Sequence, residues 1–397
     1  MRDRKIIFAG AFIRSLATSL IGVLLGIYLA KRRFDPAEVG WVVGVGLAGA
    51  ATAALVVTLA GDRLGRRRAL IALAILGGLG AVVVAFSSQL IVLATASFIG
   101  MLNGMGRDRG ASSVLDQAIL PATTGHQQRT LGFAWYNVLQ DAGHALGALL
   151  SATPVLLRHW LKLEDLASLR FMVMAYALLL LLTAALYTRL SVAVEAPAHA
   201  RVVPLTEASR RSLWKISALF GLDSLGGGFL TSSLLSFFFF QRFGATEGVV
   251  GILFFGARVA NAASHLGAAW LAKHIGLVRT MVFTHIPSSI LLVTVAYAPS
   301  FSVAAVLFLV REGLVEMDVP TRQSYVMAVV RSEERTFASG ITNLVRLGGW
   351  ALAPSFAGLL MQGTSLAAPL FVGAGMKIAY DLLLYRAFWR VKPPEET

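Results

Sequence analysis

The sequence is dominated by apolar stretches that are long enough to cross a lipid bilayer as α-helices. Hydrophobic residues make up 56% of its 397 residues and charged residues only 14%, unlike any ordinary soluble core. An apolar run of roughly 17 to 25 residues spans ~30 Å of hydrocarbon. About twelve such runs are present, with approximate extents 6–30, 40–60, 69–88, 90–120, 131–157, 171–190, 213–241, 248–272, 280–298, 301–330, 337–361 and 366–390. Because lipid offers the backbone no hydrogen-bond partners, we predict an all-α membrane protein.

Basic residues in the connections indicate which side of the membrane each connection faces. An even number of spans puts both termini on one side of the membrane. Cytoplasmic connections carry an excess of Lys and Arg, and in this chain these residues concentrate in the connections on the side of the termini. The largest groups there are Arg63, Arg66, Arg67 and Arg68 in the second connection and Arg189, Arg201, Arg210, Arg211 and Lys215 in the sixth. An exception to this positive-inside trend is the first connection, on the opposite side, which contains Lys31, Arg32 and Arg33. We therefore expect cytoplasmic termini, and attraction to anionic headgroups accounts for the net charge of +14 without a nucleic-acid partner.

The polar segment 191–215 divides the predicted spans into two sets of six. Scarce residues recur across this divide at nearly constant offsets, which indicates an internal repeat. At an offset of 206, Gln117, Arg129, Thr130, Asn137 and Gly143 match Gln323, Arg335, Thr336, Asn343 and Gly349; at 209, Ser15, Leu16, Arg33, Phe34 and Glu38 match Ser224, Leu225, Arg242, Phe243 and Glu247. We predict an N-terminal six-helix bundle over 1–190, a cytoplasmic linker over 191–212 and a C-terminal six-helix bundle over 213–397.

The connection between the second and third spans carries the motif "TLAGDRLGRRRAL", Thr58 to Leu70. It resembles the signature of the major facilitator superfamily, Gly-x-Leu-Ala-Asp-Arg-x-Gly-Arg-Arg, although Thr58 and Ala60 depart from that pattern. The matching residues are Asp62, Arg63, Gly65, Arg66 and Arg67. The resemblance implies two six-helix bundles related by a pseudo-twofold axis along the membrane normal, alternating access between them, and a cytoplasmic gate formed by these five residues. The second half has Lys273 where Asp62 would fall, so only one complete gate of this kind is expected.

Efflux-type members of that family are resembled most, which favours export by proton antiport. A second family pattern, Gly-x-x-x-Gly-Pro-x-x-Gly-Gly on the fifth span, marks many proton-driven antiporters. Here the fifth span reads "GHALGALLSA" from Gly143, with small residues but no Pro, whereas the eleventh reads "GWALAPSFAG" from Gly349 and includes Pro354. Small residues allow helices to pack closely. The missing Pro in the fifth span leaves the antiporter interpretation open.

Polar and charged residues inside the predicted spans are the candidates for the transport cavity. A charged side chain facing lipid at the bilayer centre costs at least ~2.5 kcal/mol, so such residues face a cavity or a partner. We predict that the following line the cavity or couple protons: Arg14, Arg109, Asp116, Asn137, Asp141, Asp223, Arg258, Asn261, Glu312, Glu316, Asp318, Arg322, Asn343 and Arg346. Lys377 and Asp381, on a helix that lies outside the cavity in the resembled family, are expected to pair locally.

Three positions matched by the repeat carry opposite charges: Arg14 with Asp223, Asp116 with Arg322, and Asp62 with Lys273. Repeats related by an axis along the membrane normal place matched positions at similar depth. We predict an ion pair between Arg14 and Asp223 that forms or breaks as the halves move. For Asp116 a partner within its own half is favoured, because Arg107 and Arg109 are close in sequence.

Proton coupling requires a carboxylate or a histidine whose pKa can enter the working range. Glu312 and Glu316 share a helix face within "REGLVEMDVPTR", Arg311 to Arg322, inside the predicted tenth span, and their mutual repulsion favours proton binding by one of them. The other candidates are Asp223, Asp141, His144 and His265. The two histidines come second, because intramembrane histidines are more often hydrogen-bonded core groups.

No feature of the sequence indicates an enzyme, a metal site or a cofactor. Cysteine is absent, the seven histidines show no paired spacing for metal ligands, and no Gly-rich phosphate loop suggests direct use of ATP. No nucleophile is accompanied by a base and an orienting group.

The sequence therefore predicts a secondary transporter, with proton-coupled export of a small organic compound as the first hypothesis. Intramembrane Arg residues, which can clamp carboxylate or phosphate, favour instead proton-coupled uptake of an anionic or zwitterionic metabolite. A membrane receptor that has lost transport is a third hypothesis, which predicts little need for buried charge. We expect a monomer in a prokaryotic inner membrane, with the substrate, protons and the lipid bilayer as its partners.

Overall fold

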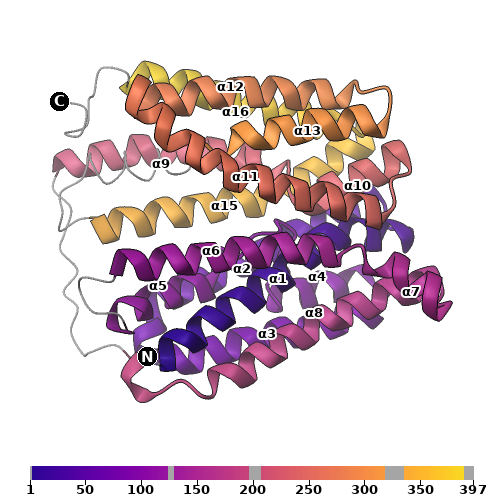
Figure 1. Ribbon diagram of the computed structural model, residues 1–397, viewed down its shortest axis with the longest axis horizontal. Helices are drawn as coiled ribbons and strands as arrows, with labels where there is room; N and C mark the ends of the chain where they lie inside the picture. Colours follow the sequence, from indigo (N-terminus) through magenta and orange to yellow (C-terminus); the bar gives the residue numbers. More distant parts are fainter. Residues whose placement is uncertain (1, 124–128, 196–206, 318–334, 389–397) are drawn as a thin grey trace. The chain divides into compact units, whose positions relative to one another are not determined.

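The computed structural model describes residues 2–123, 129–195, 207–317 and 335–388. Within these ranges the chain is mainly α-helical and contains no strand (Figure 1). The helices are α1 (Arg2–Lys31), α2 (Pro36–Leu64), α3 (Arg66–Phe86), α4 (Leu90–Ile99), α5 (Ala111–Thr123), α6 (Arg129–Leu150), α7 (Thr153–Leu161), α8 (Asp165–Tyr187), the 3₁₀ helix η2 (Val192–Val194), α9 (Glu207–Gly228), α10 (Ser232–Phe243), α11 (Glu247–Ile275), α12 (Leu277–Ala296), α13 (Phe301–Val315), α15 (Arg335–Gly363) and α16 (Ala368–Phe388). Helices lie in all the predicted spans, which confirms the all-α prediction.

Nine helical stretches in the described part of the chain are long and apolar enough to cross a membrane. Four predicted spans are interrupted, so the expectation of one continuous helix was wrong for each. The span 131–157 contains α6 and α7, separated by residues 151 and 152. The span 90–120 contains α4 and α5, separated by residues 100–110. The span 213–241 contains α9 and α10, and the helix in the span 301–330 ends at Val315. Such interruptions require local partners for the freed backbone groups.

The unwound segment between α4 and α5 depends on its glycines and on Asn103. Gly106 adopts a φ of 75°, in the left-handed region that favours glycine. A Cβ added to Gly22 of α1 would lie 2.4 Å from Gly106 Cα, so the two backbones are in contact. Asn103 Nδ2 donates to the carbonyl oxygen of Arg107 at 2.8 Å, and its Oδ1 accepts from the Met105 N–H at 3.0 Å. The Asn103 side chain thus satisfies backbone groups that a continuous helix would pair.

The chain divides into two compact units. Unit 1 comprises residues 1–198, 231–255 and 354–363, and unit 2 comprises residues 199–230, 256–353 and 364–397. Helix α10 and the C-terminal end of α15 therefore belong with the N-terminal helices of unit 1. The predicted domain boundaries at residues 190 and 212 stay a prediction.

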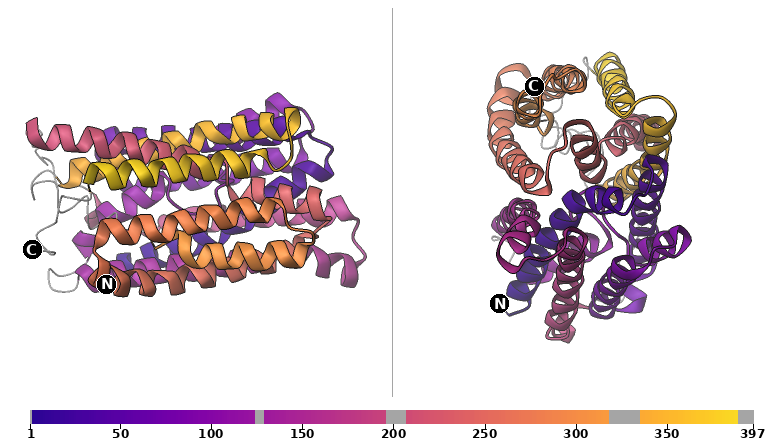
Figure 2. Two further views of the ribbon diagram at one scale, coloured as in Figure 1. Left: turned by 90° about the horizontal axis from the view of Figure 1, so that it is seen from above. Right: turned by 90° about the vertical axis from the view of Figure 1, so that its right-hand side faces the viewer.

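In unit 1, α1 packs against α6, α8 and α10, and α3 packs against α8. Figure 2 shows these helices from above and end-on. A Cβ on Gly147 of α6 would lie 2.1 Å from the carbonyl oxygen of Leu16, and a Cβ on Gly26 of α1 would lie 2.0 Å from that of Ser233. Ser233 Oγ also donates to the Gly22 carbonyl at 2.9 Å. Small residues on α1 and α6 therefore set how closely these helices approach.

In unit 2, α12 packs against α13 and α16, and α9 packs against α16. Helices α12, α13 and α16 lie side by side in Figure 1. An apolar core joins α9, α12 and α16 and consists of Ile216, Phe220, Val278, Met281, Val282, Tyr380 and Leu384. A Cβ on Gly226 would lie 3.1 Å from the Gly373 carbonyl oxygen, so α9 and α16 are closely packed.

Candidate functional site

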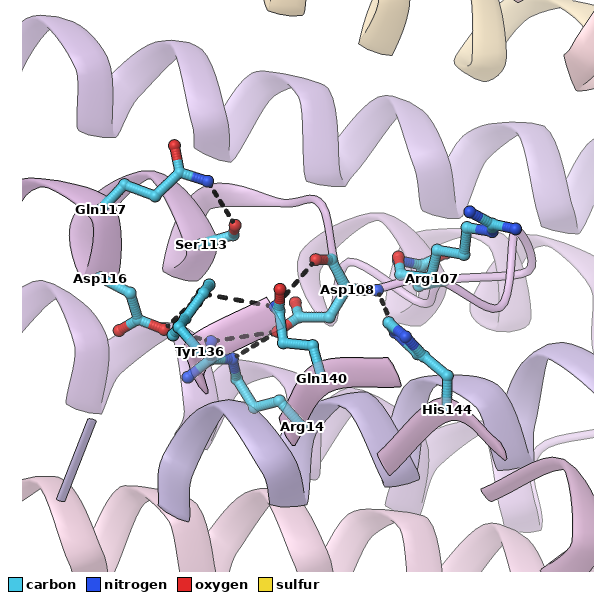
Figure 3. A network of polar contacts seen from close by, with 10 residues as sticks. Arg14, Arg107, Asp108, Ser113, Asp116, Gln117, Tyr136, Gln140 and His144 are labelled. Atoms are coloured by element: carbon cyan, nitrogen blue, oxygen red, sulfur yellow. Dashed lines mark hydrogen bonds and ion pairs between the residues drawn. The ribbon is translucent and has the colours of Figure 1, made fainter. Parts of the chain in front are cut away.

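A buried ion cluster in unit 1 is centred on Arg14 of α1 (Figure 3). Arg14 Nε donates to Asp108 Oδ2 at 3.0 Å, and its Nη2 donates to Asp116 Oδ2 at 2.5 Å. Arg14, Asp108 and Asp116 are 4%, 8% and 0% exposed. Helix α1, the unwound segment before α5, and α5 itself each contribute one member of this Arg14 cluster. The prediction that Asp116 pairs within its own half is confirmed, and its partner is Arg14.

Helix α6 presents a polar face to the Arg14 cluster. Tyr136, Gln140 and His144 follow one another at intervals of four, which places them on one face of the helix. Tyr136 Oη donates to Asp116 Oδ2 at 3.1 Å, and the Asp108 N–H donates to His144 Nε2 at 2.9 Å. Gln140 Nε2 donates to Tyr136 Oη at 3.3 Å (Figure 3). Tyr136, Gln140 and Asp108 were not among the predicted site residues, although the regular spacing of Tyr136, Gln140 and His144 is visible in the sequence.

The Arg14 cluster has one fewer cation than it has carboxyl groups. With both carboxylates ionised it carries one net negative charge, which is costly to bury. Asp116 Oδ1 is buried and has no hydrogen-bond partner within the described ranges. A cavity of about 70 Å³ adjoins the cluster, and its lining includes Arg14, Thr18, Asn103 and Asp108. A proton bound by Asp116 would make the cluster neutral.

Arg14 and Asp223 each have a partner within their own unit. The predicted ion pair between them, which would form or break as the halves move, stays a prediction. Asp223 Oδ1 accepts from Lys377 Nζ at 2.9 Å. The predicted local pair between Lys377 and Asp381 is wrong, because Asp381 instead contacts His285 Nδ1 at 3.0 Å. Helix α16 packs against both α9 and α12. Lys377 therefore pairs with Asp223 of α9 and Asp381 with His285 of α12, and the two α16 residues do not pair with each other.

A further group of buried polar side chains, in unit 2, joins α11 to the end of α13. Arg311 Nη1 donates to Glu312 Oε1, and Asn261 Nδ2 donates to Glu312 Oε2 at 2.9 Å. The same Asn261 Nδ2 donates to the Glu312 backbone carbonyl at 2.8 Å. This bond replaces the intrahelical partner that the carbonyl loses where α13 ends at Val315. Glu316 lies at the C-cap of α13, outside the helix in which both glutamates were predicted to lie.

The remaining predicted cavity residues have partly buried or exposed side chains: Arg109, Asn137, Asp141, Arg258, Asn343 and Arg346. The Arg346 guanidinium lies over the Trp350 ring, 4.9 Å from its centroid. Asp318 and Arg322 lie outside the described residues. That these residues line a transport cavity stays a prediction.

The motif between α2 and α3 forms a set of polar contacts at one end of unit 1. Asp62 and Arg63 are exposed, and Gly65, Arg66 and Arg67 are partly buried. Gly65 has a φ of 87° between the two helices, and Asp62 Oδ1 accepts from Arg66 Nε at 2.8 Å. Glu195 accepts from the backbone N–H groups of Arg66 and Arg67 at 2.6 and 3.4 Å. A carboxylate is stabilised at a helix N-terminus, and Glu195 therefore caps the N-terminus of α3. Glu195 lies outside the motif, so the motif did not predict this contact.

An ionic network, also missed from sequence, joins the ends of four helices in unit 1. Lys31 Nζ lies 2.7 Å from Asp165 Oδ2 and 3.5 Å from Glu247 Oε2. Arg158 Nη1 lies 2.8 Å from Asp165 Oδ1, and its Nη2 contacts Glu247 Oε1. The Glu247 side chain is fully buried. Lys31, which opposed the positive-inside trend, is thus held by two carboxylates.

Comparisons with known proteins agree with this architecture. Residues 7–310 match the sequence profile of the Major Facilitator Superfamily. A curated relative, "Uncharacterized membrane protein YJR124C" of Saccharomyces cerevisiae, is 25% identical over 420 residues, which cover 96% of this chain and 93% of the relative. Similar solved structures include the nucleoside transporter NupG (TM-score 0.75, 14% identity, 99% of this chain and 100% of that chain) and a D-xylose-proton symporter (TM-score 0.74, 14% identity, 99% of this chain and 98% of that chain). The chain belongs to the Major Facilitator Superfamily and is a secondary transporter.

Proposed function

We propose that this secondary transporter moves a small organic compound and couples the movement to protons through the Arg14 cluster. The observation that carries the proposal is that Asp108 and Asp116 share a single buried cation. Ionised, the cluster is negative; with one proton on Asp116 it is neutral. A buried carboxylate that gains and loses a proton as access alternates is a means of coupling the proton gradient to the substrate.

We propose export by proton antiport as the first direction, on the basis of the resemblance of the motif after α2 to efflux-type members. The second candidate is uptake of an anionic or zwitterionic metabolite together with a proton. Its support is the buried Arg14 and Arg311, since a guanidinium can bind a carboxylate or phosphate group. The D-xylose-proton symporter has a similar fold, and its name describes transport of a substrate together with a proton. A non-transporting receptor has the least support, because it would not need these buried charges.

Flux measurements in proteoliposomes distinguish these functions. Vesicles loaded with a pH-sensitive dye are given a panel of organic anions, cations and zwitterions, with and without an imposed proton gradient. Proton movement opposite to the substrate supports antiport, and movement with the substrate supports symport. Specific binding without flux would identify a receptor and contradict the proposal.

Substitutions in the cluster test the assigned proton site. Asp116→Asn fixes the neutral form, so we expect it to abolish proton-driven accumulation while substrate exchange down its own gradient continues. Asp108→Asn provides the companion variant. Glu164→Gln is the matched control, since Glu164 is an exposed carboxylate without a side-chain bond at the N-cap of α8. Accumulation by Asp116→Asn and Asp108→Asn at the rate of the control would exclude the Arg14 cluster.

We also propose that both termini face the cytoplasm, that the motif after α2 gates that side, and that the transporter works as a monomer. The prokaryotic inner membrane stays a prediction, and the curated relative is a yeast protein. The sequence contains no cysteine, so single cysteines can be labelled from one side without background. A cysteine at Arg63 should react only from the cytoplasm, and one at Glu164 only from the opposite side. Labelling with the reverse sidedness would invert the orientation.

A further inference from the structure

Unit 2 contains its own buried cluster of titratable side chains, which none of the functions proposed above uses. It consists of Asp223 from α9, His285 from α12, and Lys377 and Asp381 from α16. These four residues, here called the unit 2 quartet, are 5%, 1%, 7% and 0% exposed. They lie beside the apolar core that joins the same three helices.

The contacts of the quartet determine where its protons lie. Lys377 Nζ is 2.9 Å from Asp223 Oδ1 and 3.3 Å from His285 Nε2. An ammonium group can only donate, so His285 Nε2 accepts and carries no proton. His285 Nδ1 lies 3.0 Å from both carboxylate oxygens of Asp381, and as the protonated nitrogen of a neutral imidazole it donates to them. The imidazole is therefore neutral, between an ammonium and a carboxylate.

The charge of Asp381 is not balanced by a cation in contact with it. Within the described residues its carboxylate contacts the neutral imidazole of His285, while Lys377 pairs with Asp223. A carboxylate held in this way among apolar side chains is costly when it is ionised. Around His285, the Tyr380 ring lies edge-on at 6.1 Å. Helix α13 also packs against α12, but its charged residues Arg311 and Glu312 pair with each other. One additional proton, bound by Asp381 or by His285, compensates the charge of Asp381.

We propose that the unit 2 quartet is a second proton-binding site of this transporter, and that it takes up and releases one proton. The proton binds to an Asp381 oxygen, or to His285 Nε2 when Lys377 moves fully to Asp223. No covalent bond other than the new O–H or N–H bond changes. In the second case the ion pair between α9 and α16 becomes closer, so the charge state of the site is linked to how these helices are held together. The site rests on its own contacts and does not depend on coupling at the Arg14 cluster.

Infrared difference spectra of the purified full-length protein in lipid nanodiscs, without substrate, test this proposal. The carbonyl stretch of a protonated carboxyl group is followed as the pH changes between about 5 and about 8, a range in which buried histidines and carboxyl groups can titrate. We expect Asp381→Asn to remove a pH-dependent carboxyl signal and to reduce proton uptake by about one per molecule. We expect His285→Gln to move the pH at which that signal appears. His274→Gln should change neither, because His274 is exposed on α11 and contacts only that helix in its hydrogen bond to Trp270.

A carboxyl signal and a proton uptake that are both identical in the natural protein, Asp381→Asn and His285→Gln would overturn the proposal and identify the quartet as a fixed structural brace. If Asp381→Asn does not fold, His285→Gln gives the decision alone. These spectra require no transport. Loss of proton-coupled flux in the Asp116→Asn variant therefore leaves this test unaffected, and a negative spectral result leaves the role of the Arg14 cluster standing.

Discussion

Removal of Arg14 should reveal how strongly its cluster holds unit 1 together. In Arg14→Gln, the buried carboxylates of Asp108 and Asp116 lose a guanidinium that contacts them at 3.0 and 2.5 Å. Removing one partner of a buried ion pair typically destabilises a protein by ~3–5 kcal/mol, because an uncompensated charge stays behind. Here two carboxylates lose the same partner, so we expect a loss in the free energy of unfolding of at least about 3 kcal/mol near neutral pH.

Thermal unfolding of the purified protein, followed by tryptophan fluorescence, measures this loss. At about 2 °C per kcal/mol, the midpoint should fall by at least about 6 °C. The triple variant that adds Asp108→Asn and Asp116→Asn removes the buried charge while it keeps the side-chain shapes, so most of the loss should be recovered. Arg63→Gln, at an exposed arginine, is the control. A single Arg14→Gln variant that melts within about 1 °C of the natural protein, or a triple variant less stable than the single one, would refute the charge-balance argument.

Three further changes test other parts of unit 1. Gly147→Val should abolish folding, because its Cβ would lie 2.1 Å from a carbonyl oxygen of α1. Gly363→Ala should be neutral, because a Cβ at Gly363 would have no atom within 4 Å. Size-exclusion profiles of the two variants that do not differ would contradict the packing. Glu195→Gln should lower the free energy of unfolding by about 0.5–2 kcal/mol, because the N-terminus of α3 loses a charged cap, and an unchanged melting point would count against this role. Glu247→Gln should increase thiol labelling of a cysteine placed at the buried Ala245, because the ionic network loses a charge, and equal labelling rates would show that the network does not close this end.

The helices could be predicted from sequence because the bilayer allows few alternatives. Each apolar run must satisfy its own backbone, so length and composition were sufficient to find α1, α2, α3 and α8 nearly to their ends. The interruptions could not be predicted in the same way. A segment rich in glycine is compatible with a helix, and what ends the helix is a side chain that accepts or donates in place of the backbone. Asn103 does this within its own segment, but Asn261 does it from another helix, which no local pattern reveals.

The buried charges illustrate a second limit. Their presence inside the spans identified Arg14, Asp116 and Asp223 as important, because such residues are costly in lipid. Their partners depend on the rotation of each helix about its axis and on which helices are neighbours. The predicted repeat indicates only that matched residues lie at similar depth in the membrane. Asp108 was not identified as a partner of Arg14, because it lies in the unwound segment before α5, which the sequence did not reveal. Lys377 was assigned to the wrong carboxylate, because its partner Asp223 lies on another helix.

The predicted internal repeat relates the two buried clusters to each other. The predicted repeat matches Arg14 with Asp223, which lies 209 residues further along the chain and has the opposite charge. In this structure Arg14 contacts carboxylates in unit 1, and Asp223 contacts Lys377 in unit 2. Within the described residues, Asp116 shares Arg14 with Asp108, and Asp381 contacts the neutral imidazole of His285. Each unit thus contains a buried carboxylate with incomplete charge compensation, which is the arrangement expected if each unit binds a proton of its own.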